Sequence, residues 1–230
     1  MMPDEPDTTL PTAAESITSL DRPTAFFNAL MTEHFVLESA RSITVSESSS
    51  RSSLYLTTLS SSLVAFGFLA HTPFALGFLG AIIPVIVLLG AFTYERLVET
   101  SLEDVAALAA MQRIRRYYGR LLPEADTYFP MPRGRHAANE LLDIGRAPSW
   151  YRLLFTMSSA IAVVNSIVAG AGVAILVDQL GVDDPGSIVW GVGSAVVLAV
   201  AHLSYQVRSH TTMHELIARS EALDTDRRLP

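Results

Sequence analysis

The sequence predicts an all-α membrane protein with four transmembrane helices, arranged as two hairpins and accompanied by extended cytoplasmic helices. Half of the 230 residues are hydrophobic and only 17% are charged, whereas a soluble domain carries about 25% charged residues. The deficit is concentrated in two blocks that are almost free of charge, 54–94 and 153–206. A helix needs about 20 mostly apolar residues to cross a bilayer. Each block is therefore long enough for two spans.

The first transmembrane hairpin is expected at 54–94. Its first span, Leu54–Ala70, is interrupted by "HTP" at 71–73, because proline cannot continue a helix without losing a hydrogen bond. The second span follows at Phe74–Tyr94. Pro84 lies inside this span, where neighbouring helices can satisfy the carbonyl that the proline leaves free.

The second hairpin is expected at 153–206, with one span from 153 to 177 and another from 187 to 206. The short polar turn between them contains Asp178, Asp183 and Asp184. Serine is a favoured N-cap residue. Ser149 and Ser187 are accordingly the predicted caps of these two spans.

The distribution of arginine predicts the orientation of the chain. All 16 basic residues are arginines, and none of them lies in a span or in either short turn. Because cytoplasmic loops carry excess basic residues, both termini and the loop between the hairpins are assigned to the cytoplasm. The absence of lysine suggests a GC-rich bacterial genome, so we expect the bacterial inner membrane.

The arginines cluster most densely in "RIRRYYGR", at Arg113, Arg115, Arg116 and Arg120. We interpret them as a topology determinant that also contacts anionic lipid headgroups, at about 1 kcal/mol for each arginine near the surface. A protein partner or a charged ring on an oligomer axis is the alternative. The net charge of −7 argues against nucleic-acid binding, which usually requires a basic domain.

The regions outside the spans divide into four segments. Residues 1–23 are rich in proline and acidic residues and are predicted to be a disordered tail. Residues 24–53 form a cytoplasmic helix and a link, and the serine-rich 46–53 is either flexible or, as its lack of Gly and Pro favours, a helical continuation into the first span. Residues 95–152 begin with a helix that continues the second span to about 121, followed by an irregular loop. Residues 207–230 extend the last span as a C-terminal helix.

The helix after the second span carries an apolar stripe, with hydrophobic residues spaced by three or four. This stripe requires a partner. The candidates are the helix at 24–45 and the same helix from another subunit.

Polar and small residues inside the spans provide the candidate site. Thr57, Ser61, Asn165 and Ser166 either pack helices together or line a hydrated pore. Small residues recur at four-residue spacing in the spans, and such spacing allows helices to approach closely. No Asp, Glu, Arg or Lys lies in the central part of a span, which argues against an ion-coupled transporter.

The sequence offers little for catalysis. The chain has no cysteine, which excludes disulfides, thiolate catalysis and iron–sulfur sites. His210 and His214 have a spacing that can bind zinc, but no third ligand is evident. We therefore expect no metal, no cofactor and no enzymatic activity.

Three stretches together resemble an uncharacterised family of small bacterial four-span membrane proteins: Glu33–Arg51, Ser101–Tyr118 and Ala162–Gly170. The likeness covers residues 30–206. It implies a four-span fold and a membrane location, and it transfers no functional residue. The order of cytoplasmic helix, hairpin and long cytoplasmic helix also looks like the two-span pore-forming effectors of bacterial conflict systems, although this chain adds a second hairpin.

The function that we expect is that of a non-enzymatic membrane protein that self-associates as a scaffold or structural partner. Membrane lipids and further copies of the chain are the expected partners. The alternative is an oligomeric ion channel or pore-forming effector, and a membrane enzyme is the third hypothesis. A dry bundle with the polar residues bonded between helices favours the scaffold, whereas a central axis lined by Thr57, Ser61 or Asn165 favours the channel.

Overall fold

The computed structural model describes residues 22–121 and 156–226, and within these ranges the chain is helical apart from its short turns. There are four helices, α2 (Arg22–Leu69), α3 (Ala75–Leu121), α6 (Met157–Gln179) and α7 (Asp184–Asp226). All four are long and apolar enough to cross a membrane. The predicted all-α membrane fold with four spans is thus confirmed.

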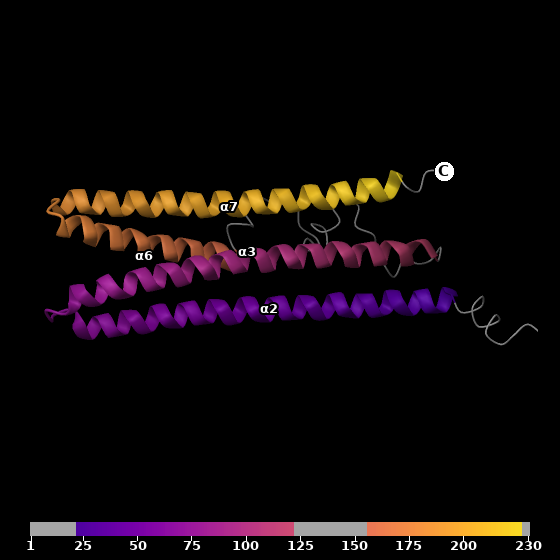
Figure 1. Ribbon diagram of the computed structural model, residues 1–230, viewed down its shortest axis with the longest axis horizontal. Coiled ribbons are helices and arrows are strands. Elements are labelled where there is room, and N and C mark those ends of the chain that lie inside the picture. The colour runs from indigo at the N-terminus through magenta and orange to yellow at the C-terminus, as the bar shows by residue number, and fades with distance from the viewer. Residues whose placement is uncertain (1–21, 122–155, 227–230) are drawn as a thin grey trace, which may run out of the picture.

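The helices form two antiparallel hairpins, α2–α3 and α6–α7, whose axes run along the length of the molecule (Figure 1). Both hairpin turns lie at one end of the molecule. The N-terminal end of α2 and the C-terminal ends of α3 and α7 lie at the opposite end. Helix α3 is central, because it packs against α2, α6 and α7. The outer face of α2 is consequently left uncovered along most of the helix.

The two turns break the helices where the sequence predicts. The hydroxyl of Thr72 donates to the carbonyl of Leu69 at 2.8 Å, which satisfies one of the free carbonyls at the end of α2. In the second turn Gly181 has a φ of 88°, a left-handed conformation that favours glycine. Its N–H donates to the carbonyl of Asp178 at 2.9 Å, which closes the end of α6.

Both helices of the second hairpin begin at residues other than the predicted span starts. Helix α6 begins at Met157 rather than 153, because the side chain of Thr156 accepts a hydrogen bond from the N–H of Ser159 and so caps the helix. Ser149, its predicted cap, lies outside the described residues. Helix α7 begins three residues before Ser187, and the Ser187 N–H already donates to the carbonyl of Asp183 at 2.9 Å. The preset φ of Pro185 suits this first turn.

Three of the helices are much longer than a bilayer requires. Helix α2 has 48 residues, about 72 Å at 1.5 Å per residue, whereas bilayer hydrocarbon is about 30 Å thick. It runs unbroken through the serine-rich 46–53. The prediction that this segment continues as a helix into the first span is therefore confirmed. We call the parts outside the predicted spans (22–53, 95–121 and 207–226) the arm.

The predicted stripe on α3 finds two partners. At the far end of the arm the rings of Phe26 and Tyr117 pack edge to face, 5.5 Å apart, so α2 covers one side as expected. On another side, Val105 and Ala109 pack against Met213 and Ile217 of α7. The sequence did not indicate this second contact.

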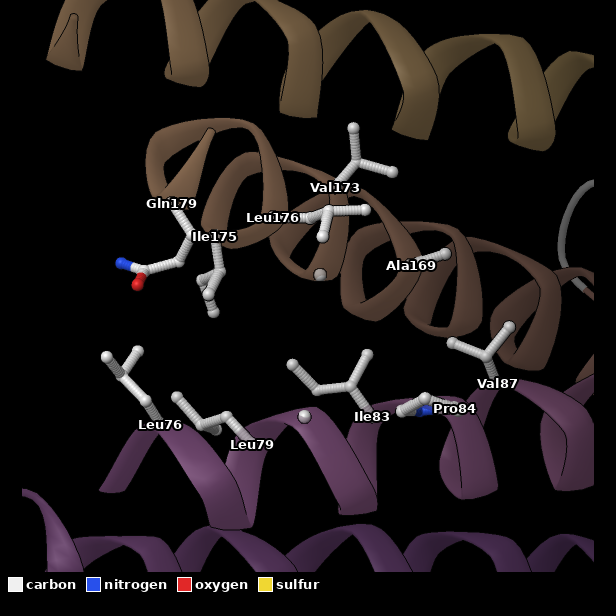
Figure 2. Close-up of a pocket in the computed structure, with 12 residues that line it drawn as sticks. Leu76, Leu79, Ile83, Pro84, Val87, Ala169, Val173, Ile175, Leu176 and Gln179 are labelled. Atoms are coloured by element: carbon white, nitrogen blue, oxygen red, sulfur yellow. The ribbon is translucent and has the colours of Figure 1, made fainter. Parts of the chain in front are cut away.

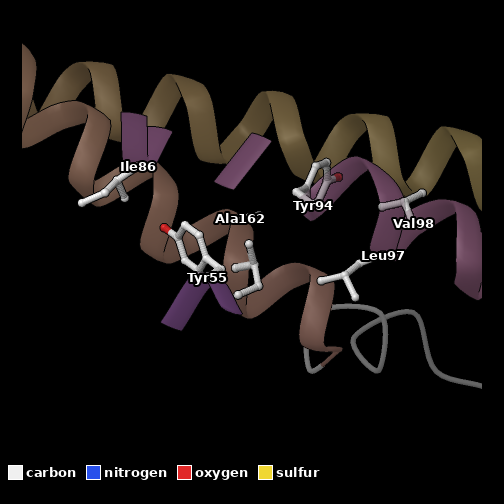
Figure 3. Close-up of a cluster of buried hydrophobic side chains, with 7 residues drawn as sticks. Tyr55, Ile86, Tyr94, Leu97, Val98 and Ala162 are labelled. Atoms are coloured by element: carbon white, nitrogen blue, oxygen red, sulfur yellow. The ribbon is translucent and has the colours of Figure 1, made fainter. Parts of the chain in front are cut away.

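The main core lies where the two hairpins meet. Figure 3 shows Tyr55 of α2, Ile86 of α3 and Ala162 of α6 converging there. Further along α3, Leu97 and Val98 continue the core into the arm. Elsewhere the spans are little buried by the rest of the chain. In the most apolar stretch of α2, of α3 and of α7, only 11% of the residues are buried, as expected for helices that face lipid.

Candidate functional site

Asn165 forms the principal polar contact between the two hairpins. Its side chain is 1% exposed, and its Nδ2 donates to the carbonyl of Val87 at 3.2 Å. The hydroxyl of Tyr55 approaches Asn165 Oδ1 at 3.5 Å, at the limit of a hydrogen bond. One amide therefore connects α6 to α3 and touches α2.

Gly90 makes this contact possible. A Cβ placed at Gly90 would lie 2.2 Å from Asn165 Oδ1 and 2.8 Å from Cε2 of Tyr55. Both distances are well below van der Waals contact, so only glycine allows the asparagine to reach the α3 backbone. A small residue that lets two membrane helices approach is a common feature of such interfaces.

Ser166 is buried beside Asn165, and its hydroxyl donates to the carbonyl of Ala162 within α6 at 2.7 Å. Both residues thus occupy a packed contact between helices rather than the wall of a channel through one chain. The structure does not bring Thr57 and Ser61 to this place. They are exposed on the outer face of α2, so the four predicted residues fall into an interior pair and a surface pair.

A second polar contact, which the sequence did not indicate, ties the start of α6 to α7. The hydroxyl of Ser159 donates to Gln206 Oε1 at 3.1 Å, and Gln206 Nε2 donates to Thr156 Oγ1 at 3.1 Å. Gln206 is only 1% exposed. The buried amide is satisfied, as a polar group at this depth requires.

Ion pairs connect α2 and α3 immediately outside the predicted spans. Arg96 holds Glu47 through two bonds, Nε to Oε1 at 2.9 Å and Nη2 to Oε2 at 3.2 Å. Arg51 also donates to Glu47, at 2.9 Å. The guanidinium of Arg96, followed by that of Arg51, lowers the pKa of Glu47 to about 2. Glu47 in turn raises the pKa of Arg96 further above its ordinary range.

The outer face of α2 carries a heptad pattern that was not among the features predicted from the sequence. Ten residues alternate in steps of three and four, and every one of them is exposed. We call them the α2 heptad face: Val36, Ser39, Ile43, Ser46, Ser50, Ser53, Thr57, Ser60, Val64 and Gly67. One position of each heptad is always Ser or Gly. The signal was present in the sequence as a repeat of 3.5 residues, which becomes visible once 22–69 is treated as one helix.

The exposed face of α7 has a different composition. Its exposed residues in the span are mostly large and apolar, and they include Ile188, Val192, Val196 and Val200, with Gly193 as an exposed exception. These side chains suit a surface that contacts lipid tails. The hydroxyl-bearing and small residues of the α2 heptad face are typical of contacts between membrane helices instead.

The arginine cluster lies far along the arm. Arg113 and Arg115 are exposed on α3. The structure does not describe the side chains of Arg116 and Arg120. Arg113 is about 28 Å beyond Tyr94 at 1.5 Å per residue. Because exposed charges are screened over about 8–10 Å, headgroup contact requires the arm to lean onto the membrane. This contact stays a prediction.

His210 and His214 both lie on α7. His210 Nδ1 lies 2.9 Å from the carbonyl of Gln206, and its Nε2 lies 3.4 Å from the Ser101 hydroxyl. Across 22–121 and 156–226, no three His, Cys, Asp or Glu side chains are grouped as metal ligands.

Comparison with protein-family models, with curated proteins and with solved structures finds no match for this chain. The resemblance inferred from the sequence therefore stays a prediction. The candidate site rests on the geometry of the chain alone, and its strongest element is the uncovered α2 heptad face.

Proposed function

We propose that the protein is a non-enzymatic scaffold of the bacterial inner membrane that self-associates through the α2 heptad face, with its arm in the cytoplasm. The observation that carries the proposal is the uninterrupted exposure of this face from the arm into the span. A 3.5-residue repeat favours a left-handed pairing of two helices, because it keeps one seam facing the partner.

The chemistry of the face suits pairing in both environments that it crosses. In the arm, Val36 and Ile43 are 55% and 63% exposed, and covering them removes apolar surface from water. In the span, water is absent, and close approach over Ser60 and Gly67 provides packing and hydroxyl contacts instead. A second copy of α2 supplies a complementary surface in both parts at once.

The interior supports a scaffold more than a conduit or an enzyme. Asn165 and Ser166 are satisfied within helix contacts. Within 22–121 and 156–226, the ionic side chains that form ion pairs belong to the arm. These residues thus stabilise the bundle, and the exposed α2 face is left for association.

An oligomeric channel is the second candidate, because Thr57 and Ser61 present hydroxyl groups on the surface of a span. In a ring of several copies these side chains would surround the axis. In a dimer they would be covered by the partner helix. The number of copies therefore separates the two functions.

The test measures the oligomeric state of the full chain in nanodiscs and detergent. Ser60→Phe and Gly67→Phe place a bulky ring on the α2 heptad face, and each should weaken association by about tenfold or more. Gly193→Phe on α7 is the matched control, because neither Gly67 nor Gly193 has an atom within 4 Å of an added Cβ. A monomeric wild type, or equal effects of all three substitutions, would contradict the scaffold proposal.

Conductance across liposomes distinguishes the channel. A dimer without ion flux supports the scaffold. A larger ring whose conductance changes on Thr57→Val, with no change in copy number, would instead establish the channel.

A further inference from the structure

A groove separates the two hairpins at the end that carries the turns. Its volume is about 420 Å³, and it lies between α3 and α6 (Figure 2). Its walls are aliphatic, with Leu76, Leu79 and Ile83 on one side and Val173, Ile175 and Leu176 on the other. Apart from Gln179, the residues that line the groove lie within the predicted spans, so the hydrocarbon of the bilayer surrounds most of it.

Two features of α3 keep the groove open. Gly80 lines it without a side chain, and a Cβ added there would meet no atom within 4 Å. Pro84, which also lines it, removes the amide donor for the Gly80 carbonyl and loosens the helix at that point. At Gly172 of α6, an added Cβ would lie 2.8 Å from Cγ2 of Ile83. The helices meet at Gly172, and the groove extends around that contact.

One polar residue, Gln179, lines the groove, and acidic residues lie next to it in the sequence without lining the groove. Gln179 lines its outer end, and in Figure 2 its amide lies across the gap from Leu76. Gln179 Nε2 donates to Asp178 Oδ2 at 3.3 Å. The same turn contains Asp183 and Asp184, and neither turn contains an arginine or lysine. A bound headgroup would therefore meet negative charge without a compensating protein cation.

We propose that the groove binds one acyl chain of an ethanolamine phospholipid, whose ammonium group lies beside Asp178 and Gln179. The aliphatic walls suit a hydrocarbon chain, and the volume falls within the range of ligand sites. The carboxylate attracts the ammonium and repels a lipid with net negative charge. This lipid bridges the hairpins beside their contact at Gly172, and its site is separate from the α2 heptad face.

Native mass spectrometry tests the site on full chains released from nanodiscs that contain equal amounts of phosphatidylethanolamine and phosphatidylglycerol. The wild type should retain one phosphatidylethanolamine per chain, with about a fivefold preference over phosphatidylglycerol, the size of effect that one exposed charge pair provides. Gly80→Phe fills the groove and should abolish retention. Gly77→Phe on the same helix is the control and should retain the lipid, because Gly77 does not line the groove.

Asp178→Asn isolates the headgroup contact without altering the groove. It should reduce the preference for phosphatidylethanolamine to about parity while one lipid per chain is still retained. Equal retention of both lipids by the wild type would overturn the proposal. So would undiminished retention by Gly80→Phe in a variant that keeps the helical content of the wild type.

Discussion

The side chain of Asn165 occupies the space that a Cβ on Gly90 would fill, so this contact between the two hairpins depends on one asparagine and one glycine. We predict that Gly90→Ala destabilises the bundle by about 1–3 kcal/mol, because overpacking forces neighbouring atoms to move. Unfolding in mixed detergent measures the loss. Gly77→Ala is the control and should have little effect, because an added Cβ there meets open space.

Replacing Asn165 removes the hydrogen bond without changing the glycine. Asn165→Leu keeps a similar volume but cannot donate to the carbonyl of Val87, so we expect a loss of about 1 kcal/mol, the usual size of a hydrogen bond between membrane helices. Tyr55→Phe should cost less, about 0.5 kcal/mol or below, because its bond to Asn165 is long at 3.5 Å. The same unfolding assay ranks the two variants. A larger effect for Tyr55→Phe would contradict the assigned roles.

The four spans and the long helices were predictable because few physical alternatives exist. An apolar run of about 20 residues in a membrane protein has to satisfy its backbone internally, and a helix does so. The turns at Pro73 and Gly181 follow from the same local chemistry, since one residue cannot continue a helix and the other readily adopts the left-handed conformation. Such features depend on neighbours in sequence and need no knowledge of tertiary contacts.

The orientation of α2 around its own axis could not be predicted, because hydroxyl residues occupy both of its faces. Ser48 bonds to Thr100 of α3 at 2.9 Å and Ser52 is buried, whereas Ser46, Ser50 and Ser53 are exposed. Composition does not distinguish these two sets. The heptad repeat is present in the sequence, but only the contact with α3 shows which serines are uncovered.

The ion pairs at the base of the arm predict an acid transition. The pKa of Glu47 is lowered to about 2 in the folded chain, from 4.5. Its stabilising contribution is therefore complete above pH 4.5, declines below that pH, and is lost as the pH falls through about 2. Thermal unfolding of the arm, followed by circular dichroism from pH 7 to pH 2, should show this decline.

Other carboxylates also titrate in this range, so the informative quantity is the difference between the wild type and Glu47→Gln. That difference should be greatest at neutral pH and vanish near pH 2, where the wild-type carboxylate becomes protonated. A difference that does not change with pH would show that Glu47 acts through packing rather than charge. Added salt should also reduce the difference at neutral pH, because these side chains are partly exposed.

The absence of cysteine makes the orientation of the helices testable with single substitutions. Leu180 lies in the second turn and is 75% exposed, and Leu216 lies in the arm and is 55% exposed. Because the arginines lie outside both turns, the positive-inside rule places Leu180 on the outer side and Leu216 in the cytoplasm. A membrane-impermeant maleimide should label Leu180→Cys in right-side-out vesicles and Leu216→Cys in inverted vesicles. Labelling of both positions in the same vesicles would mean that α7 does not cross the bilayer, whereas the reverse pattern would keep the four spans and invert the assigned topology.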